Sequence, residues 1–162
     1  MPELPSKIWR DLPIEKRVAV ADAFWRDDRD SDELDAQRVE ALVAIARRLN
    51  FRPKSVQALP IERRAKQLAH QPDVSDTIAA RALIAFHMVT KRPMMAAFLD
   101  AVGIAHEDGI ISAEEVPPLD PAHLKAGVKA LRDGFTEEDV TLYLQTLTAL
   151  DSQTWGELEK LM

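Results

Sequence analysis

The sequence predicts an all-α protein, an irregular bundle of about eight helices. Apolar residues recur at helical spacing along most of the chain. Capping residues or prolines precede these segments, and glycine or proline follows several of them. No run alternates apolar and polar residues with β-branched enrichment, and no Asn-Gly or Asp-Gly joins two such runs. These observations together favour helices and leave no segment for a sheet.

The first three helices are expected in the first 72 residues. Proline is tolerated in a first helical turn, and Ser or Asp caps helices well. The expected starts are Pro13, then Ser31 or Asp32, then Pro60. The apolar faces comprise Ile14, Val18, Ala21 and Trp25 in the first helix, Val39, Leu42, Ala46 and Leu49 in the second, and Ile61, Ala65 and Leu68 in the third. Pro53 and Pro72 are expected to end the second and third helices.

Five more helices are expected after this point. Their starts are marked by Ser75, Pro93, Asp120 with Pro121, Thr136, and Asp151 or Ser152. Residues 77–89 are apolar on nearly all sides, which is typical of a helix in the middle of a bundle. Gly103 and Gly134 are expected stops for the helices that precede them.

The chain is expected to form a single domain, residues 1–162, and a subdivision into 1–103, a connecting loop 104–119 and 120–162 stays open. The net charge of −6 is unevenly divided. Residues 1–96 hold 17 Lys and Arg against 14 Asp and Glu, a net of +3, whereas residues 97–162 hold 4 against 13, a net of −9. The acidic C-terminal part therefore differs electrically from the rest.

Composition excludes several classes of site. Without cysteine there is no disulfide or thiolate zinc site, and the five scattered glycines make no phosphate-binding loop, so no cofactor is expected. The longest apolar segment, Thr77–Val89, is shorter than the roughly 20 residues that cross a bilayer. The first residues have no apolar run after a basic segment, so they are not expected to form a secretory signal. A soluble, cytoplasmic protein with no membrane partner is predicted.

A short motif occurs twice in the N-terminal half. LPIEKR at residues 12–17 returns as LPIERR at residues 59–64, identical at five of six positions. Each copy begins an expected helix that a longer helix follows. A duplicated helical hairpin would explain the repeat, and so would the independent use of good helix-start residues. The sequence leaves both interpretations open.

The segment from Asp108 to Glu115 resembles the second half of an EF-hand calcium loop. With Gly109 at the sixth position, Asp108, Ser112 and Glu115 occupy ligand positions 5, 9 and 12. The first ligand positions fall on Ile104 and His106, and Pro117 with Pro118 interrupts the exit helix. The alternative is a turn at residues 107–109, an apolar pair Ile110-Ile111 in the core, and a helical turn capped by Ser112.

Two other groups of residues are candidates for function. His106, Glu107 and Asp108 could serve an acid/base or metal site, although no spacing places two ligands on one helical face. Seven cations form a basic cluster in residues 47–66, opposed only by Glu62: Arg47, Arg48, Arg52, Lys54, Arg63, Arg64 and Lys66. This cluster could bind a polyanion or a partner, or could be a solvated face. The acidic total charge argues against nucleic acid.

The sequence therefore favours a non-catalytic protein-protein interaction module over an enzyme. Its partner is expected to be another protein or a second copy in a homodimer, chosen in part by the charge asymmetry. An enzyme or metal-binding protein using the segment from His106 to Asp108 is the alternative. Weak polyanion binding through the basic cluster is the second alternative.

Overall fold

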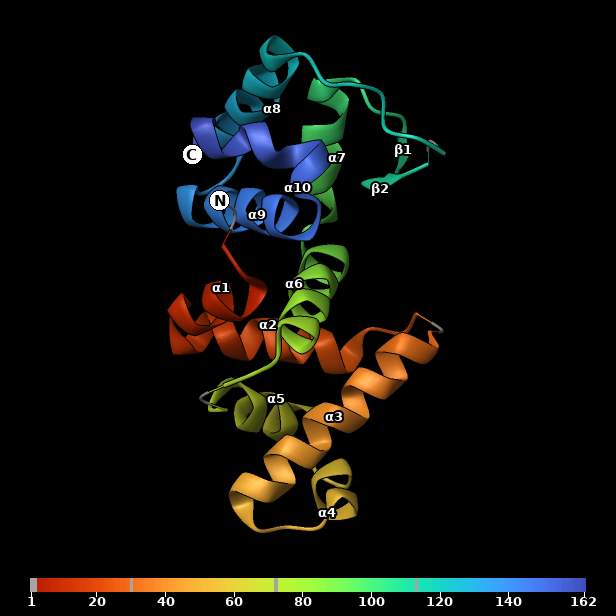
Figure 1. Cartoon of the computed structure of the whole chain (residues 1–162), viewed down its shortest axis with the longest axis vertical. Coiled ribbons are helices and arrows are strands. Elements are labelled where there is room, and N and C mark those ends of the chain that lie inside the picture. Colours follow the sequence, from red (N-terminus) through yellow and green to blue (C-terminus); the bar gives the residue numbers. More distant parts are fainter. Residues whose placement is uncertain (1–2, 30, 72, 113) are drawn as a thin grey trace. The chain divides into compact units, whose positions relative to one another are not determined.

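The computed structural model describes residues 3–29, 31–71, 73–112 and 114–162. In these residues it has ten α-helices, one 3-10 helix and one two-stranded sheet, which confirms the all-α class (Figure 1). The two helices beyond the expected eight are α1 (Pro5–Asp11) and α4 (Pro53–Gln57). Pro53 therefore begins a helix, and the expectation that it ends one was wrong. The expected stop at Pro72 lies outside the described residues.

Contacts between residues group the chain into two compact units. The N-terminal unit is Leu4–Val89, and the C-terminal unit is Thr90–Met162 with residues 1–3. The first holds 15 Lys and Arg against 13 Asp and Glu, a net of +2; the second holds 6 against 14, a net of −8. Residues 104–119 lie within the C-terminal unit. The number of independent folding domains stays a prediction.

The N-terminal unit contains α1 to α6. Besides α1 and α4, its helices are α2 (Ile14–Arg26), α3 (Asp32–Leu49), α5 (Ile61–Ala69) and α6 (Asp76–Thr90), the last of which ends one residue into the next unit. Ser31 accepts a hydrogen bond from the Leu34 amide at the start of α3, and Ser75 accepts one from Ile78 at the start of α6. These caps confirm the two expected starts.

The repeated motif has the same local structure in both copies. Pro13 and Pro60 occupy the position before α2 and α5 with nearly equal backbone angles, φ −58° and −55°, ψ 152° and 151°. A short proline-initiated helix precedes each copy, a longer helix follows each, and α2 packs against α5. The resemblance thus extends over three helices, α1–α3 and α4–α6. Whether it reflects duplication stays a prediction.

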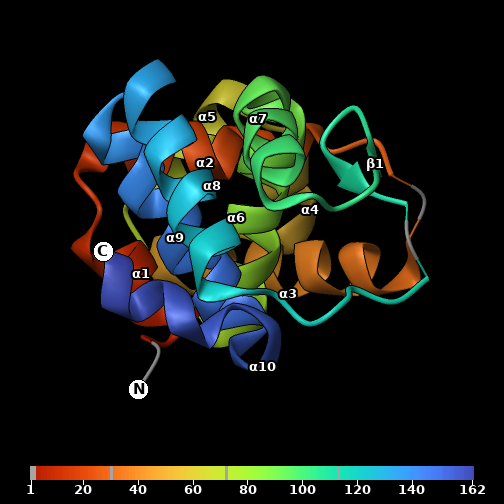
Figure 2. The same cartoon turned by 90° about the horizontal axis from the view of Figure 1, so that it is seen from above.

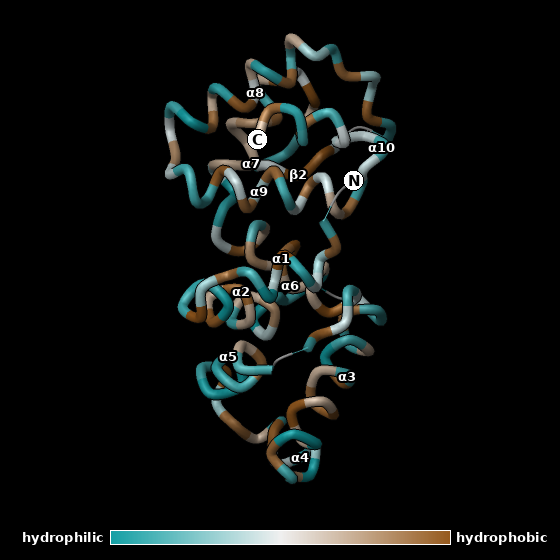
Figure 3. The backbone as a smooth tube through the Cα atoms, turned by 60° about the vertical axis from the view of Figure 1, so that its left-hand side comes forward, coloured by the Kyte–Doolittle hydropathy of each residue, from teal (hydrophilic) through white to brown (hydrophobic). Residues whose placement is uncertain are grey.

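The core of the N-terminal unit agrees with the expected apolar faces only in part. Leu68 and Leu83 were expected to be buried, whereas Trp9, Phe24 and Ile45 were on none of those faces, and Val39, which was, is 58% exposed. Figure 3 shows hydrophobic and hydrophilic residues alternating along the helices of each unit. Trp9, Phe24, Ile45, Leu68 and Leu83 are fully buried. Burial of such side chains is the main stabilising contribution to a helical unit of this size.

Helix α6 matches its expected role only in part. Its residues from Ile78 to His87 are largely buried, as expected for a central helix, whereas Val89 near its end is exposed. None of the described helices combines the length and apolarity needed to span a bilayer.

The C-terminal unit contains the remaining helices and the sheet. Its elements are α7 (Arg92–Val102), β1 (His106–Glu107), β2 (Ile110–Ile111), α8 (Pro121–Gly134), α9 (Glu137–Leu150), α10 (Ser152–Trp155) and the 3-10 helix η1 (Gly156–Leu161). Asp120, Thr136 and Asp151 each accept a hydrogen bond from a first-turn amide, which confirms three expected caps. Phe98, Tyr143 and Trp155 lie together in the core of this unit.

The sheet corrects one expectation. β1 and β2 form an antiparallel hairpin through Asp108-Gly109, although the sequence analysis found no strands joined by this dipeptide. Asp108 has φ 52° and Gly109 φ 87°, and positive φ at both central residues is the requirement of a type I′ turn. The strands are two residues long, too short for a hydropathy pattern to show. Figure 2 shows the hairpin beside α7.

Other details of this segment differ from the expected plug and cap. Ile111 packs against the core, but Ile110 is 38% exposed and so does not. The Ser112 amide donates to the Ala105 carbonyl and continues the pairing of the two strands. Residues 114–115 form a bend rather than part of a helix, and Ala113, in the expected helical turn, lies outside the described residues.

Candidate binding site

The hairpin uses both ring nitrogens of His106. Nε2 lies 2.6 Å from Asp100 Oδ1, and Nδ1 accepts a hydrogen bond from the Gly109 amide at 3.0 Å. A general acid or base needs a nitrogen within hydrogen-bonding reach of its substrate. Because both nitrogens contact the chain itself, the geometry supports a structural role for His106, which holds the hairpin turn and the end of α7 together.

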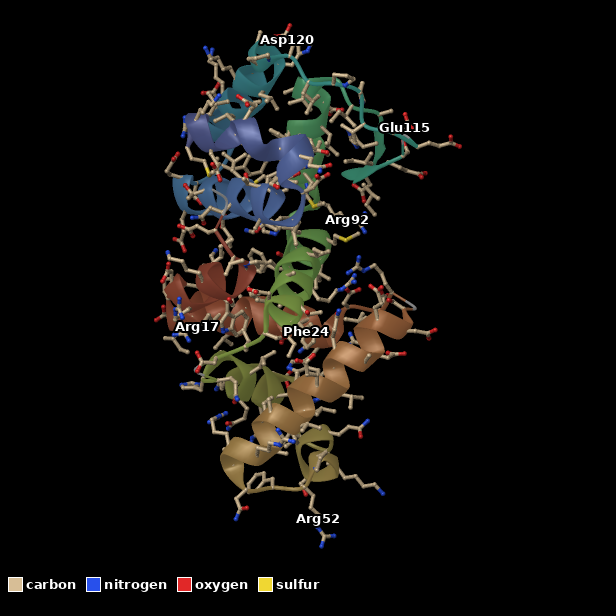
Figure 4. All side chains as sticks on the ribbon, in the orientation of Figure 1. Arg17, Phe24, Arg52, Arg92, Glu115 and Asp120 are labelled. Carbon is tan, nitrogen blue, oxygen red and sulfur yellow. The ribbon has the colours of Figure 1, made fainter. Side chains whose placement is uncertain are left out.

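The remaining candidates of this segment point outward. Asp108 is exposed, and Arg92 contacts both its carboxylate, at 3.6 Å, and its carbonyl oxygen, at 3.2 Å. Glu107 and Ser112 are exposed, and Glu115 extends away from the fold (Figure 4). Within residues 3–29, 31–71, 73–112 and 114–162, no three His, Asp or Glu side chains gather in a group that could hold a metal ion.

The basic cluster divides into exposed and engaged residues. Arg48 donates hydrogen bonds to Gln67 and Gln71. Five cations at the end of α3, on α4 and on α5 are exposed and make no ion pair with a described side chain, and Figure 4 shows Arg52 extending away from the fold. We call these five residues the basic surface: Arg47, Arg52, Lys54, Arg63 and Lys66. Glu62, the one acid among them in sequence, pairs with Arg26 at 2.9 Å.

Arg64 is the exception within the cluster. Its guanidinium carbon lies 5.2 Å from the centre of the Trp25 ring, a cation–π contact, and its Nε donates to the Leu59 carbonyl at 3.1 Å. The side chain is half-buried. Burial and the nearby charge of Arg38 lower the pKa of Arg64 from its ordinary value. The side chain remains cationic, because arginine deprotonates only far above neutral pH.

Arg38 on α3 lies at the C-terminal end of α2. Its guanidinium donates to the carbonyl oxygens of Phe24 at 3.0 Å and Trp25 at 3.3 Å, and also to that of Asp27. The last carbonyls of a helix have no partner within the helix and carry partial negative charge. Arg38 satisfies them from another helix, and so fixes α3 against the end of α2.

Arg38 and Arg64 line the same hollow on the N-terminal unit. This hollow has a volume of about 320 Å³, and its wall also includes Trp25, Val39, Leu42 and Asp35. The wall residues come from α2, α3 and α5, with Gln57 added from α4. Val39 is 58% exposed, whereas Trp25 and Leu42 are buried. The site thus combines two guanidinium groups with an apolar wall.

Sequence reasoning found one of these residues, Arg64, and missed the rest. Trp25 and Leu42 were expected only on the apolar faces of their helices, and Arg38 was not singled out. The signal that could have pointed to Arg38 is its place in the second turn of a helix, seven residues after the Ser31 cap, between the apolar positions Leu34 and Leu42.

Comparisons of the chain with protein-family models, with curated proteins and with solved structures found no match. Any function proposed for it therefore rests on its own residues and their geometry.

Proposed function

We propose that this protein is a non-catalytic interaction module that binds an acidic segment of a protein partner through the basic surface of the N-terminal unit. The observation that carries the proposal is the set of five exposed cations without ion pairs among the described side chains. A surface of one sign attracts a segment of the other sign and orients it before contact. The hollow in the same unit, whose wall includes Gln57 on α4 and Arg64 on α5, supplies apolar contacts that charge alone cannot provide.

The arrangement of the hairpin supports binding rather than catalysis. His106 is engaged at both nitrogens, and Asp108 faces Arg92. A protein partner is favoured over nucleic acid because the whole chain carries a net charge of −6, which repels a phosphate backbone outside the basic surface. The acidic C-terminal unit of a second copy of the chain is also negatively charged. The experiment below distinguishes binding of a second copy from binding of a different protein.

The test uses a fluorescent peptide of alternating Glu and Leu residues and measures its anisotropy. We expect binding that weakens strongly between about 0.01 M and about 0.15 M salt, because the screening length falls from about 30 Å to about 8 Å. The triple variant Arg47→Gln, Arg52→Gln and Lys54→Gln should weaken binding roughly tenfold, as several exposed ion pairs of modest energy are lost together.

A matched control separates the surface from the total charge. Lys125→Gln, Lys129→Gln and Lys160→Gln change the net charge equally on the C-terminal unit, and should leave binding within about twofold. Equal weakening by both triple variants would contradict the proposal. Tighter binding of a DNA duplex than of the peptide would also contradict it. A salt-sensitive dimer that sedimentation detects and the first triple variant abolishes would contradict it as well, because the basic surface would then bind a second copy of the chain.

A further inference from the structure

We propose that the hollow lined by Arg38 and Arg64 binds a carboxylate joined to an aliphatic group. The two groups that would hold the carboxylate are the guanidiniums of Arg38 and Arg64, and the aliphatic group would lie against Val39 and Leu42. This inference rests on the proposed function, because it names what part of the acidic segment the protein recognises. The carboxylate can be the C-terminus of a partner or a Glu or Asp side chain beside an aliphatic residue.

Both guanidiniums are held in place by backbone carbonyls. Arg64 donates to Leu59 through Nε, which leaves both of its terminal nitrogens without a partner among the described residues. Arg38 uses Nε and one terminal nitrogen on the end of α2, and its other terminal nitrogen has no described partner. The two terminal nitrogens of Arg64 can therefore donate two parallel hydrogen bonds to a carboxylate, and the remaining terminal nitrogen of Arg38 can donate another. Because backbone carbonyls already hold both side chains, little entropy is lost on binding.

The hollow has more positive than negative charge. Arg38 and Arg64 are close enough to repel each other, and neither forms an ion pair with a carboxylate in the described part of the chain, although the charge of Arg38 also acts on the Asp27 carboxylate. Asp35 lines the hollow but is exposed. A bound carboxylate would relieve the repulsion between the two guanidiniums, and Asp35 would oppose that carboxylate.

The size and lining of the hollow define the rest of the ligand. A volume of about 320 Å³ is at the lower end of the range for small-molecule sites, roughly 300 to 1,000 Å³, and suits one or two amino-acid residues. Val39 is a large apolar side chain left mostly exposed at the rim. An aliphatic side chain placed there would remove both apolar surfaces from water. The site therefore fits an aliphatic residue with a carboxylate on it or next to it.

The experiment follows the Trp25 indole N–H signal by two-dimensional NMR, with Trp25→Phe to assign it. Three compounds are added in turn. N-acetyl-leucine has a terminal carboxylate, N-acetyl-leucyl-glutamic acid amide has a side-chain carboxylate, and N-acetyl-leucinamide has no carboxylate. We expect one or both carboxylates to shift the Trp25 signal in a saturable way, while the amide and the signals of Trp9 and Trp155 do not respond. The compound that binds more tightly indicates whether the site recognises a C-terminal carboxylate or a side-chain carboxylate of the partner. No saturable shift, or an equal shift with the amide, would overturn the inference.

Variants test the two charges. Arg64→Gln should weaken carboxylate binding at least tenfold, as expected for losing hydrogen bonds to a charged group. Arg10→Gln, the same charge change at an exposed residue of the same unit outside both proposed sites, should change it less than about twofold. Asp35→Asn should strengthen binding about threefold, a gain that misfolding cannot produce. Equal effects of Arg64→Gln and Arg10→Gln, or no gain with Asp35→Asn, would overturn the inference.

The two proposals can fail separately. If the acidic peptide binds and the basic-surface variant weakens it, but Arg64→Gln does not, only the carboxylate site is wrong. If the peptide does not bind while N-acetyl-leucine still shifts the Trp25 signal, the proposed function is wrong and the carboxylate site stands.

Discussion

Arg64 lies over the ring of Trp25, 5.2 Å from its centre, and so connects α5 to the end of α2. In the sequence Arg64 is one of seven cations within 20 residues, and Arg63 beside it has no such contact. Arg64 therefore has a structural role in the basic cluster that its neighbour Arg63 lacks.

The first prediction concerns this contact. Arg64→Ala removes the cation–π contact and the hydrogen bond to Leu59, so we expect the free energy of unfolding to fall by about 1 to 2 kcal/mol. Arg63→Ala should change it by less than about 0.5 kcal/mol, as for an ordinary surface substitution. Urea unfolding followed by circular dichroism measures both. Equal losses would show that the contact with Trp25 contributes nothing.

The second prediction concerns the packing of α7 on α8. A Cβ atom on Gly127 would lie 2.6 Å from Val102 Cγ1 and 2.8 Å from Phe98 Cε2, which is closer than atoms approach. Gly127→Ala should therefore cost about 1 to 3 kcal/mol by overpacking the core. Gly134→Ala, at the end of the same helix with no described atom within 4 Å, is the control and should be close to neutral. A neutral Gly127→Ala would mean that the two helices can move apart freely.

The third prediction separates backbone strain at the end of α7 from close contact at the hairpin turn. Gly103 and Gly109 both have positive φ, 80° and 87°, but only Gly109 faces other atoms, with the Arg92 carbonyl oxygen 2.9 Å from a Cβ there. Gly103→Ala should cost about 1 to 2 kcal/mol from strain alone. Gly109→Ala should cost more, and thermal unfolding should show the difference. Equal costs would mean that the contact between the hairpin and α7 adjusts to the added methyl group without loss of stability.

The fourth prediction is a pH dependence carried by Asp27, which is only 4% exposed. Burial alone would raise the pKa of Asp27, but hydrogen bonds from Arg29 and the charges of Arg29 and Arg38 outweigh it, so the pKa is lowered. A carboxylate with a lowered pKa in the folded state stabilises the protein above its unfolded pKa, about 3.9, and loses this contribution as pH falls through the folded value.

The expected outcome follows from that sign. Asp27→Asn should destabilise the protein near neutral pH, and the difference from the wild type should shrink as the pH falls below about 4. Urea midpoints measured from neutral pH down to about pH 3 test this, with Asp28→Asn, an exposed neighbour, as the control. A difference that stays constant over this range would show that the charge of Asp27 does not matter to stability.

Sequence reasoning recovered most of the helices because their signals are local. The Ser31, Ser75, Asp120, Thr136 and Asp151 caps each bind an amide two or three residues away, and side-chain spacing along one helix determines its buried face. It missed α1 and α4 because each is only five to seven residues long, too short to show a period. The hairpin escaped for the same reason, with strands of two residues.

The sequence by itself determined the all-α class, the starts of the eight expected helices and the two parts of unequal charge, because propensity, capping and composition act between near neighbours. Only the tertiary structure decided which charged residues act together. Arg38 reaches the end of α2, 11 to 14 residues back in the chain, and Arg64 reaches Trp25, 39 positions away in sequence. Contacts of this kind depend on how helices pack, and no spacing within one helix encodes them. The candidate carboxylate site exists because α2, α3 and α5 bring these two cations to one hollow.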